Sequence, residues 1–152
     1  MTEDAPRVWI TRSGEETEAL GAQLLGAAPS PGAPCRLVTL SGELGSGKST
    51  FARGALRALG VTGPIKSPSY TLIEVYELPG VNVVHLDLYR LIDPDELENL
   101  GLSDYHQPDH LWLIEWPERA AGRLPPADLG FVFSITEAGH RIERIETFKS
   151  DK

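Results

Sequence analysis

Residues 42–49, Gly-Glu-Leu-Gly-Ser-Gly-Lys-Ser, fit the pattern G-x-x-x-x-G-K-[ST], and the fold class follows from this stretch and its flanks. In such a P-loop the glycines let successive backbone N–H groups converge on phosphate oxygens. Lys48 then reaches the β- and γ-phosphates, the Ser49 hydroxyl binds magnesium, and Thr50 is placed to contact the α-phosphate. We therefore predict a site for a nucleoside triphosphate with magnesium.

The segments on either side of this loop have the composition that a P-loop requires. Residues 36–40 predict a strand, and residues 49–59 predict a helix that Gly60 closes at the expected C-terminal position. A strand before the loop and a helix after it distinguish a phosphate site from an ordinary glycine turn. The phosphates are therefore expected at the N-terminus of the second predicted helix.

Patterns elsewhere in the chain predict a small mixed sheet. Residues 8–11 alternate like a strand, and Ser13 with Glu16 forms a capping box that starts the first helix. Two turns containing glycine indicate hairpins, which add antiparallel strands. The remaining predicted elements are hairpin strands at 70–78, 81–88, 130–136 and 141–148, a buried strand at 111–116, and a short acidic helix at 93–100. The predicted fold class is α/β, a three-layer P-loop NTPase fold with a mixed parallel and antiparallel sheet.

Two acidic residues that end β-rich runs are candidates for the magnesium site. Asp87 closes the run 83–87, and Glu115 closes the more continuous apolar run 111–115. A P-loop enzyme needs such an acid at the end of a neighbouring strand to orient the metal and its water shell. One acid could hold the metal while the other positions or activates the attacking water. The residues alone leave this division open, so both are candidate metal ligands and catalytic groups.

Length and composition predict one domain spanning residues 1–152. With 152 residues, 41% of them apolar and 24% charged, the chain can bury one core and has no room for a second domain. The net charge of −8, without a run of basic residues, argues against a wide basic surface, so any RNA would be held by another protein. The single Cys35 cannot form an internal disulfide, and we interpret it as a packing residue at a strand edge.

The sequence also predicts where the protein works. No apolar run approaches the roughly 20 residues that cross a bilayer, and the N-terminus lacks a basic segment followed by a long hydrophobic one. We therefore expect a cytoplasmic protein with no membrane partner.

Four ordered motifs together resemble the bacterial TsaE (YjeE) family. They are G-E-L-G-S-G-K-S-T at 42–50, K-S-P-S-Y-T-L at 66–72, H-L-D-L-Y-R-L at 85–91 and I-E-W-P-E at 114–118. The resemblance runs from Ser13 to about Pro117. It implies the ATPase component of the machinery that makes N6-threonylcarbamoyladenosine at position 37 of tRNAs reading A-starting codons. The implied activity is slow ATP hydrolysis with magnesium, and the implied partners are TsaB and TsaD, with tRNA reached through that complex.

The resemblance also implies roles for individual residues. Ser49 and Glu115 would hold the magnesium, Asp87 would be the Walker B-like acid needed for hydrolysis, and residues 67–71 would form a switch-like loop. The catalytic groups would be Lys48, Asp87 and Glu115. The nucleotide would be bound by the phosphate loop, by the N-terminal segment that approaches the adenine and by two outlying side chains, giving the set Gly42, Leu44, Gly45, Ser46, Gly47, Lys48, Ser49, Thr50, Gly14, Trp116 and Arg141.

The chain departs from the family pattern at two places. Ser49 stands where relatives often have threonine, a change that keeps the metal-binding hydroxyl. Near the C-terminus, where relatives tend to carry Gly-Arg, this chain has Gly139-His140-Arg141. Whether His140 or Arg141 contacts the nucleotide is open at this point.

Other nucleotide-dependent functions fit the motif less well. A small-molecule kinase would have the same P-loop and a similar length, but it needs an arginine-rich lid. Arg119 and Arg123 are only weak evidence for such a lid. A GTPase would carry an N-K-x-D motif, which is absent from the sequence. A binding module that uses ATP only to stabilise a partner interface would bind ATP tightly without turnover.

Overall fold

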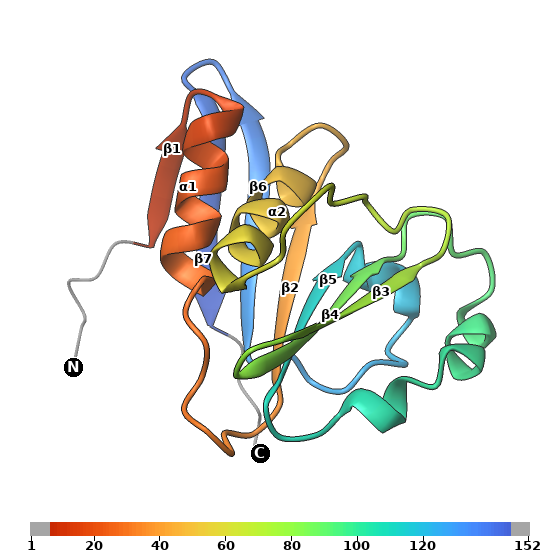
Figure 1. Cartoon of the computed structure of the whole chain (residues 1–152). Coiled ribbons are helices and arrows are strands. Elements are labelled where there is room, and N and C mark those ends of the chain that lie inside the picture. Colours follow the sequence, from red (N-terminus) through yellow and green to blue (C-terminus); the bar gives the residue numbers. More distant parts are fainter. Residues whose placement is uncertain (1–6, 147–152) are drawn as a thin grey trace.

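The computed structural model describes residues 7–146. The strand that leads into the P-loop lies at the centre of the sheet (Figure 1). The strands are β1 (Val8–Thr11), β2 (Arg36–Gly42), β3 (Ile73–Leu78), β4 (Val81–Asp87), β5 (His110–Glu115), β6 (Leu129–Thr136) and β7 (Gly139–Glu146). The helices are α1 (Gly14–Leu25) and α2 (Lys48–Leu59), with 3₁₀ helices η1 (Pro94–Leu100), η2 (Leu102–Tyr105) and η3 (Pro117–Ala120). No helix of this part of the chain is both long and apolar enough to span a membrane.

The sheet is mixed, as the sequence predicts. Its strand order is β1-β7-β6-β2-β5-β4-β3. Strands β6, β2, β5 and β4 pair in parallel, while β3, through its hairpin with β4, and β7, through its hairpin with β6, run antiparallel to their neighbours. The strand β1 then pairs antiparallel with β7 at the edge. Because the central strands are parallel, the carboxyl ends of β2, β4 and β5 meet at one edge of the sheet.

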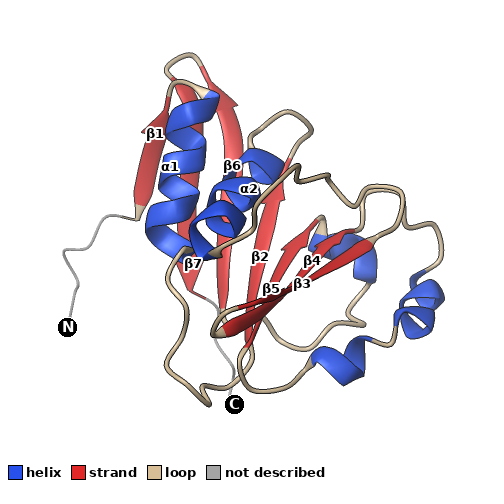
Figure 2. Cartoon of the chain, in the orientation of Figure 1, coloured by secondary structure: helices blue, strands red, loops and turns tan. Residues whose placement is uncertain are grey.

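Two apolar clusters on opposite faces of the sheet make the three layers. Figure 2 shows α1 and α2 lying along one face of the sheet. On one face α1 and α2 cover side chains such as Val83 and Leu113. On the other face the 3₁₀ helices and their connections cover side chains such as Leu86 and Trp112. Successive side chains of a strand point to opposite faces, so the central strands β2, β4 and β5 each contribute to both clusters. The α/β fold class is confirmed, with 3₁₀ helices and loops as its third layer.

The two α-helices pack closely because a glycine lies at each contact point. A Cβ placed on Gly21 of α1 would lie 2.0 Å from the Phe51 carbonyl oxygen, and one on Gly54 of α2 would lie 2.0 Å from the Glu18 carbonyl oxygen. Neither backbone oxygen can move without shifting its helix. This close packing sets the position of α2, whose first residue is Lys48.

Predicted element boundaries need a few corrections. The strand expected from residue 70 begins only at Ile73, because Leu72 has a φ of 70° and its N–H donates to the Pro68 carbonyl oxygen in a turn. The strand expected to reach Trp116 ends at Glu115, because Trp116 has a φ of 59°. The acidic helix is a 3₁₀ helix capped by Asp93, whose Oδ1 accepts from the Asp95 N–H. The predicted end of the last strand at 147–148 lies outside the described residues.

The structure confirms Ser13 as the N-cap of α1, but the second contact of the predicted capping box is made to a different residue. The Ser13 hydroxyl oxygen accepts a hydrogen bond from the Glu16 N–H at 3.1 Å. In a capping box the Glu16 carboxylate would accept from the N–H of the N-cap residue, Ser13. Here it accepts instead from the N–H of Arg12, one residue earlier, at 2.7 Å. Both contacts stabilise the turn between β1 and α1.

Candidate functional site

The P-loop leaves β2 and enters α2 through three glycines with positive φ. The values are 149° at Gly42, 77° at Gly45 and 106° at Gly47, a region that other residues rarely adopt. A Cβ at Gly42 would also lie 2.4 Å from the carbonyl oxygen of Phe133 on the neighbouring strand. Glycine is therefore needed at Gly42 for both conformation and space, and the loop delivers the free N–H groups of the α2 N-terminus to one point.

The Lys48 side chain folds back over the start of the P-loop. Its ammonium donates to the carbonyl oxygens of Gly42 at 2.5 Å and Glu43 at 2.9 Å. Burial lowers the pKa of this side chain below its ordinary value, while the carboxylates of Glu115 and Asp87 act in the opposite direction. The geometry places a desolvated positive charge at the mouth of the loop, where it can bind phosphate strongly.

Asp87 and Glu115 lie side by side at the carboxyl ends of β4 and β5. They are partners in the parallel register of these strands, and both are buried. Both side chains are on the face that α2 covers, since Val83, four residues before Asp87, belongs to the same helix-covered cluster. The structure therefore brings together the two acids that the sequence could only place at separate strand ends.

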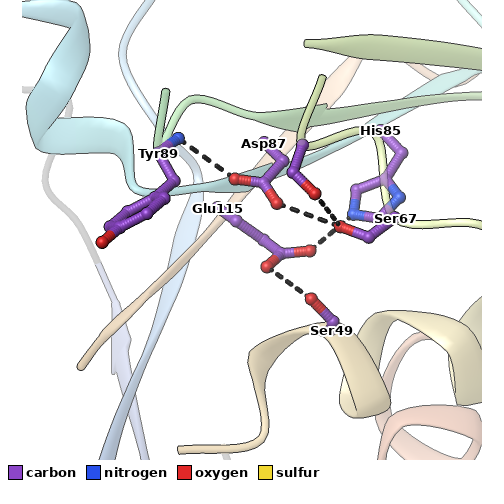
Figure 3. Close-up of polar contacts among 7 residues, drawn as sticks. Ser49, Ser67, His85, Asp87, Tyr89 and Glu115 are labelled. Atoms are coloured by element: carbon purple, nitrogen blue, oxygen red, sulfur yellow. Dashed lines mark hydrogen bonds and ion pairs between the residues drawn. The ribbon is translucent and has the colours of Figure 1, made fainter. Parts of the chain in front are cut away.

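The two acids have different partners (Figure 3). Glu115 Oε1 accepts a hydrogen bond from the Ser49 hydroxyl at 2.9 Å. Asp87 Oδ2 accepts from the Ser67 hydroxyl at 3.0 Å, and its Oδ1 accepts from the Tyr89 N–H at 3.1 Å. Glu115 is thus linked to the P-loop helix, and Asp87 is linked to the loop that precedes β3.

A cavity of about 550 Å³ opens beside these groups. Its lining comes from the P-loop, the loop before β3 and the ends of three strands, and comprises Leu44, Gly45, Gly47, Lys48, Ser49, Thr50, Ser67, Ser69, Asp87, Tyr89, Arg90, Glu115, Trp116 and His140. Most of the predicted site residues are therefore brought together around one cavity. Its size falls within the usual range for small-molecule sites.

Four predicted nucleotide-binding residues do not line this cavity. Gly42 and the buried Ser46 belong to the loop but are absent from the cavity lining. The Ser46 Oγ donates to the Glu43 carbonyl oxygen at 2.7 Å. Gly14 at the start of α1 is outside the lining. Arg141 is also outside, and its guanidinium donates to the Glu143 carboxylate at 3.1 Å. Between the two residues that the sequence left open, the structure places His140 at the cavity, next to Gly47.

Trp116 forms the aromatic wall of the cavity. Its ring centroid lies 4.4 Å from the Lys48 ammonium and 4.9 Å from the ring centroid of Tyr89. The Arg119 guanidinium lies 5.2 Å from the Tyr89 ring centroid and 5.5 Å from that of Trp116. The backbone at Trp116 is left-handed where β5 ends, and the indole lines the cavity while it also packs, partly buried, against the apolar cluster that contains Leu86 and Trp112.

Sequence reasoning missed several residues of the site. His85 Nε2 lies 2.7 Å from Glu115 Oε2, and both side chains are only 2% exposed. Tyr89 and Arg90 line the cavity and belong to the motif at 85–91, but no role was predicted for either side chain. The available signal for His85 was a polar residue inside the apolar run 83–88, two positions before Asp87 and hence on the same face.

The donor set fits magnesium bound together with a nucleotide. In the described part of the chain no group of three or more His, Cys, Asp or Glu side chains could hold a metal alone. Magnesium bound with substrate phosphates needs only one or two carboxylates, with phosphate oxygens and water completing its shell. Ser49, Glu115 and Asp87 supply oxygen donors of that kind beside the loop that would hold the phosphates.

Both the sequence and the structure are similar to those of known proteins. Residues 11–144 match the family model described as threonylcarbamoyl adenosine biosynthesis protein TsaE. The tRNA threonylcarbamoyladenosine biosynthesis protein TsaE of Haemophilus influenzae is 50% identical over 109 residues, covering 72% of this chain and 69% of its own. The protein of that name from Bacillus subtilis is 35% identical over 147 residues, covering 90% and 89%. The crystal structure of Bacillus subtilis YdiB superposes with a TM-score of 0.70 at 28% identity, covering 90% of this chain and 82% of that one.

Proposed function

The chain belongs to the TsaE family, and from this premise and the geometry of the site we propose that it is the ATP-binding component of tRNA threonylcarbamoyladenosine biosynthesis. It binds ATP with magnesium in the cavity at the carboxyl ends of β2, β4 and β5 and hydrolyses it slowly. One observation carries the hydrolytic part of the proposal. Asp87 and Glu115 are register partners on adjacent parallel strands, directly beside the P-loop hydroxyl of Ser49.

The contacts support a division of roles between the two acids. The Ser49 hydroxyl and the Glu115 carboxylate would hold the magnesium, because they already face each other at 2.9 Å. The bound magnesium would supply charge neutralisation between the β- and γ-phosphates. Asp87 lies next to the Ser67 hydroxyl and would accept a hydrogen bond from the attacking water. Its carboxylate would orient this water for attack on the γ-phosphate, the role of a water-positioning residue.

Slow turnover of the isolated chain follows from the side chains around the cavity. Fast P-loop hydrolases place an arginine on the transition-state charge. Arg90 lines the cavity, but its guanidinium donates to the Tyr70 hydroxyl at 3.2 Å and lies 4.3 Å from the Tyr70 ring centroid. Arg90, the arginine of the cavity lining, is thus held by Tyr70, so a partner would have to release it or supply another.

The acidic surface supports an indirect role in RNA modification. With a net charge of −8, the chain lacks the phosphate-neutralising surface that a direct tRNA contact needs. We infer that it acts on the TsaB–TsaD complex, which holds the tRNA, and that ATP binding and hydrolysis reset this complex between catalytic cycles. The protein would then act in the cytoplasm, as one domain.

Nucleoside analysis of tRNA from cells depleted of this protein tests the pathway. We expect threonylcarbamoyladenosine to fall while nucleotide pools stay normal, since the chain would hydrolyse ATP only slowly and would phosphorylate no small molecule. Undiminished threonylcarbamoyladenosine would contradict the proposal, and altered nucleotide pools would favour a small-molecule kinase instead.

Multiple-turnover modification of tRNA by the reconstituted system tests the ATPase step. Lys48→Ala should abolish ATP binding, and Asp87→Ala should leave binding while lowering hydrolysis by roughly 100-fold or more, in the range of a lost catalytic group. Both variants should stop modification after about one cycle, whereas Glu77→Ala, at an exposed position of β3, should behave as wild type. Sustained turnover with Asp87→Ala would leave only a role in which ATP binding stabilises the partner interface.

A further inference from the structure

The carboxylate of Glu115 is held at both of its oxygens. Oε1 accepts from the Ser49 hydroxyl at 2.9 Å, and Oε2 lies 2.7 Å from His85 Nε2. An ionised carboxylate can only accept hydrogen bonds, so the proton of this second contact belongs to His85 Nε2. In Figure 3 one dashed line joins Ser49 to one oxygen of the Glu115 carboxylate, and another leaves the second oxygen toward His85.

A histidine at position 85 destabilises the fold relative to an aliphatic residue if it serves packing alone. The side chain is 2% exposed and follows Val83 and Val84 in a strand with an apolar interior. Its Nδ1 atom is buried and has no hydrogen-bond partner among the described residues. A buried polar atom without a partner costs free energy that an aliphatic side chain of similar size would avoid. Within residues 7–146 the one polar contact of the imidazole is with Glu115.

The position of His85 explains how it reaches that carboxylate. His85 and Asp87 are two residues apart in β4 and therefore point to the same face of the sheet. Asp87 is the register partner of Glu115, so His85 is the diagonal neighbour of Glu115 across two parallel strands. The imidazole is buried against Glu115 and is absent from the cavity lining.

We propose that His85 is a positioning residue for magnesium, which holds one oxygen of Glu115 so that the other faces Ser49 and the metal. This inference rests on the proposed ATP site. Without the His85 contact the carboxylate can rotate about its terminal bond, and the metal must then order it on binding. Removing an outer hydrogen-bond partner of a metal ligand typically weakens metal binding about 10- to 100-fold.

A pair of amide variants separates positioning from packing. In His85→Gln the side-chain N–H₂ can reach about as far as Nε2, whereas in His85→Asn the same group ends near the Nδ1 position and falls short of Glu115. The measured quantity is the magnesium concentration that half-saturates ATP binding, followed by tryptophan fluorescence of the full chain. We expect about a 10-fold increase or more for His85→Asn, and a value within about 3-fold of wild type for His85→Gln.

Two further readings test whether the effect passes through Glu115. ATP affinity in the presence of a chelator should be the same, within about 2-fold, for wild type and both variants, because no magnesium is then bound. In a Glu115→Gln background, His85→Asn should add nothing further to the magnesium requirement. Thermal unfolding without nucleotide shows whether each variant is folded.

Four results would contradict the role of His85 or of the ATP site. If the Asn and Gln variants require equal magnesium, or if His85→Asn weakens ATP binding equally with and without magnesium, His85 is only a packing residue. If the effect of His85→Asn persists in full in the Glu115→Gln background, it does not act through Glu115. If wild type binds no ATP even with magnesium, the proposed function itself fails, which is a separate outcome from the loss of the His85 role.

Discussion

Trp116 is the residue whose surroundings should respond most directly to ATP. Its indole contacts the Lys48 ammonium, and phosphate would draw that ammonium toward itself. We predict that ATP changes the tryptophan emission and that Trp116→Phe removes most of the change. The chain has two other tryptophans, of which Trp9 is in the edge strand β1 and Trp112 is buried with its Nε1–H on the Tyr105 carbonyl oxygen.

The control for this prediction is Trp9→Phe, which should keep the full change in emission. The measurement is a fluorescence titration with ATP and magnesium at constant protein concentration. An unaltered response in Trp116→Phe would contradict the placement of the nucleotide beside the indole.

Cys35 should be an unreactive thiol in the folded chain. Burial and the nearby carboxylate of Asp128 raise its pKa from 9.0 to about 11, partly opposed by a hydrogen bond from the Gln107 backbone. At pH 9 about half of the unfolded chain but only about one per cent of the folded chain would be thiolate. Alkylation by iodoacetamide at this pH should therefore be roughly 50-fold slower in the native protein than in denaturant, as followed by mass spectrometry.

The same shift predicts the pH dependence of stability. Between pH 9 and about 11 the unfolded chain loses the Cys35 proton first, so deprotonation favours unfolding. The contribution of Cys35 is fully present below pH 9 and is lost as pH rises through about 11. Cys35→Ser should flatten this part of the stability curve, and an identical decline in the variant would assign the effect to other groups.

At the scale of elements, the contact between α1 and α2 depends on two glycines. In Gly21→Ala the new methyl group would meet the Phe51 carbonyl oxygen at 2.0 Å, which forces the helices apart. We expect the free energy of unfolding to fall by about 1–3 kcal/mol, as overpacking of a close contact usually costs. Chemical denaturation measures the change.

Gly14→Ala is the matched control, because it lies in the same helix with nothing within 4 Å of the new methyl group. Its stability should be unchanged or higher by up to about 1 kcal/mol, since alanine has less conformational freedom to lose. If both variants lost the same stability, the loss in Gly21→Ala could not be assigned to the close helix contact, because alanine is a better helix former than glycine at both positions.

At the scale of the whole molecule, ATP with magnesium should stabilise the folded chain. The site combines residues from α2, β4 and β5, so the unfolded chain cannot form it. A ligand at 100 times its Kd adds about 2.7 kcal/mol. For a chain of this size the melting temperature should then rise by roughly 5–10 °C, measured by differential scanning fluorimetry.

Two controls make the thermal shift specific. Lys48→Ala should show no rise with ATP, because it lacks the ammonium at the phosphate loop. Glu77→Ala should rise as wild type does. Equal shifts for wild type and Lys48→Ala would place ATP binding somewhere other than the P-loop.

Local sequence patterns determined most elements and the phosphate loop. The G-x-x-x-x-G-K-S pattern, the flanking strand and helix, both hairpins and the capping residue Ser13 are short-range features, since each depends on residues only a few positions apart. The errors lie where backbone conformation is set by turns, at Leu72 and Trp116, whose positive φ has no signature in composition.

Tertiary structure alone decided how the acids of the site are arranged. That β5 lies between β2 and β4 is not encoded in the periodicity of any strand, and this order makes Asp87 and Glu115 register partners. It also brings His85 within 2.7 Å of Glu115 and places His140, rather than Arg141, beside the loop. The sequence by itself therefore determined a phosphate loop and two candidate acids, whereas long-range strand pairing decided which oxygen of which acid faces the P-loop serine.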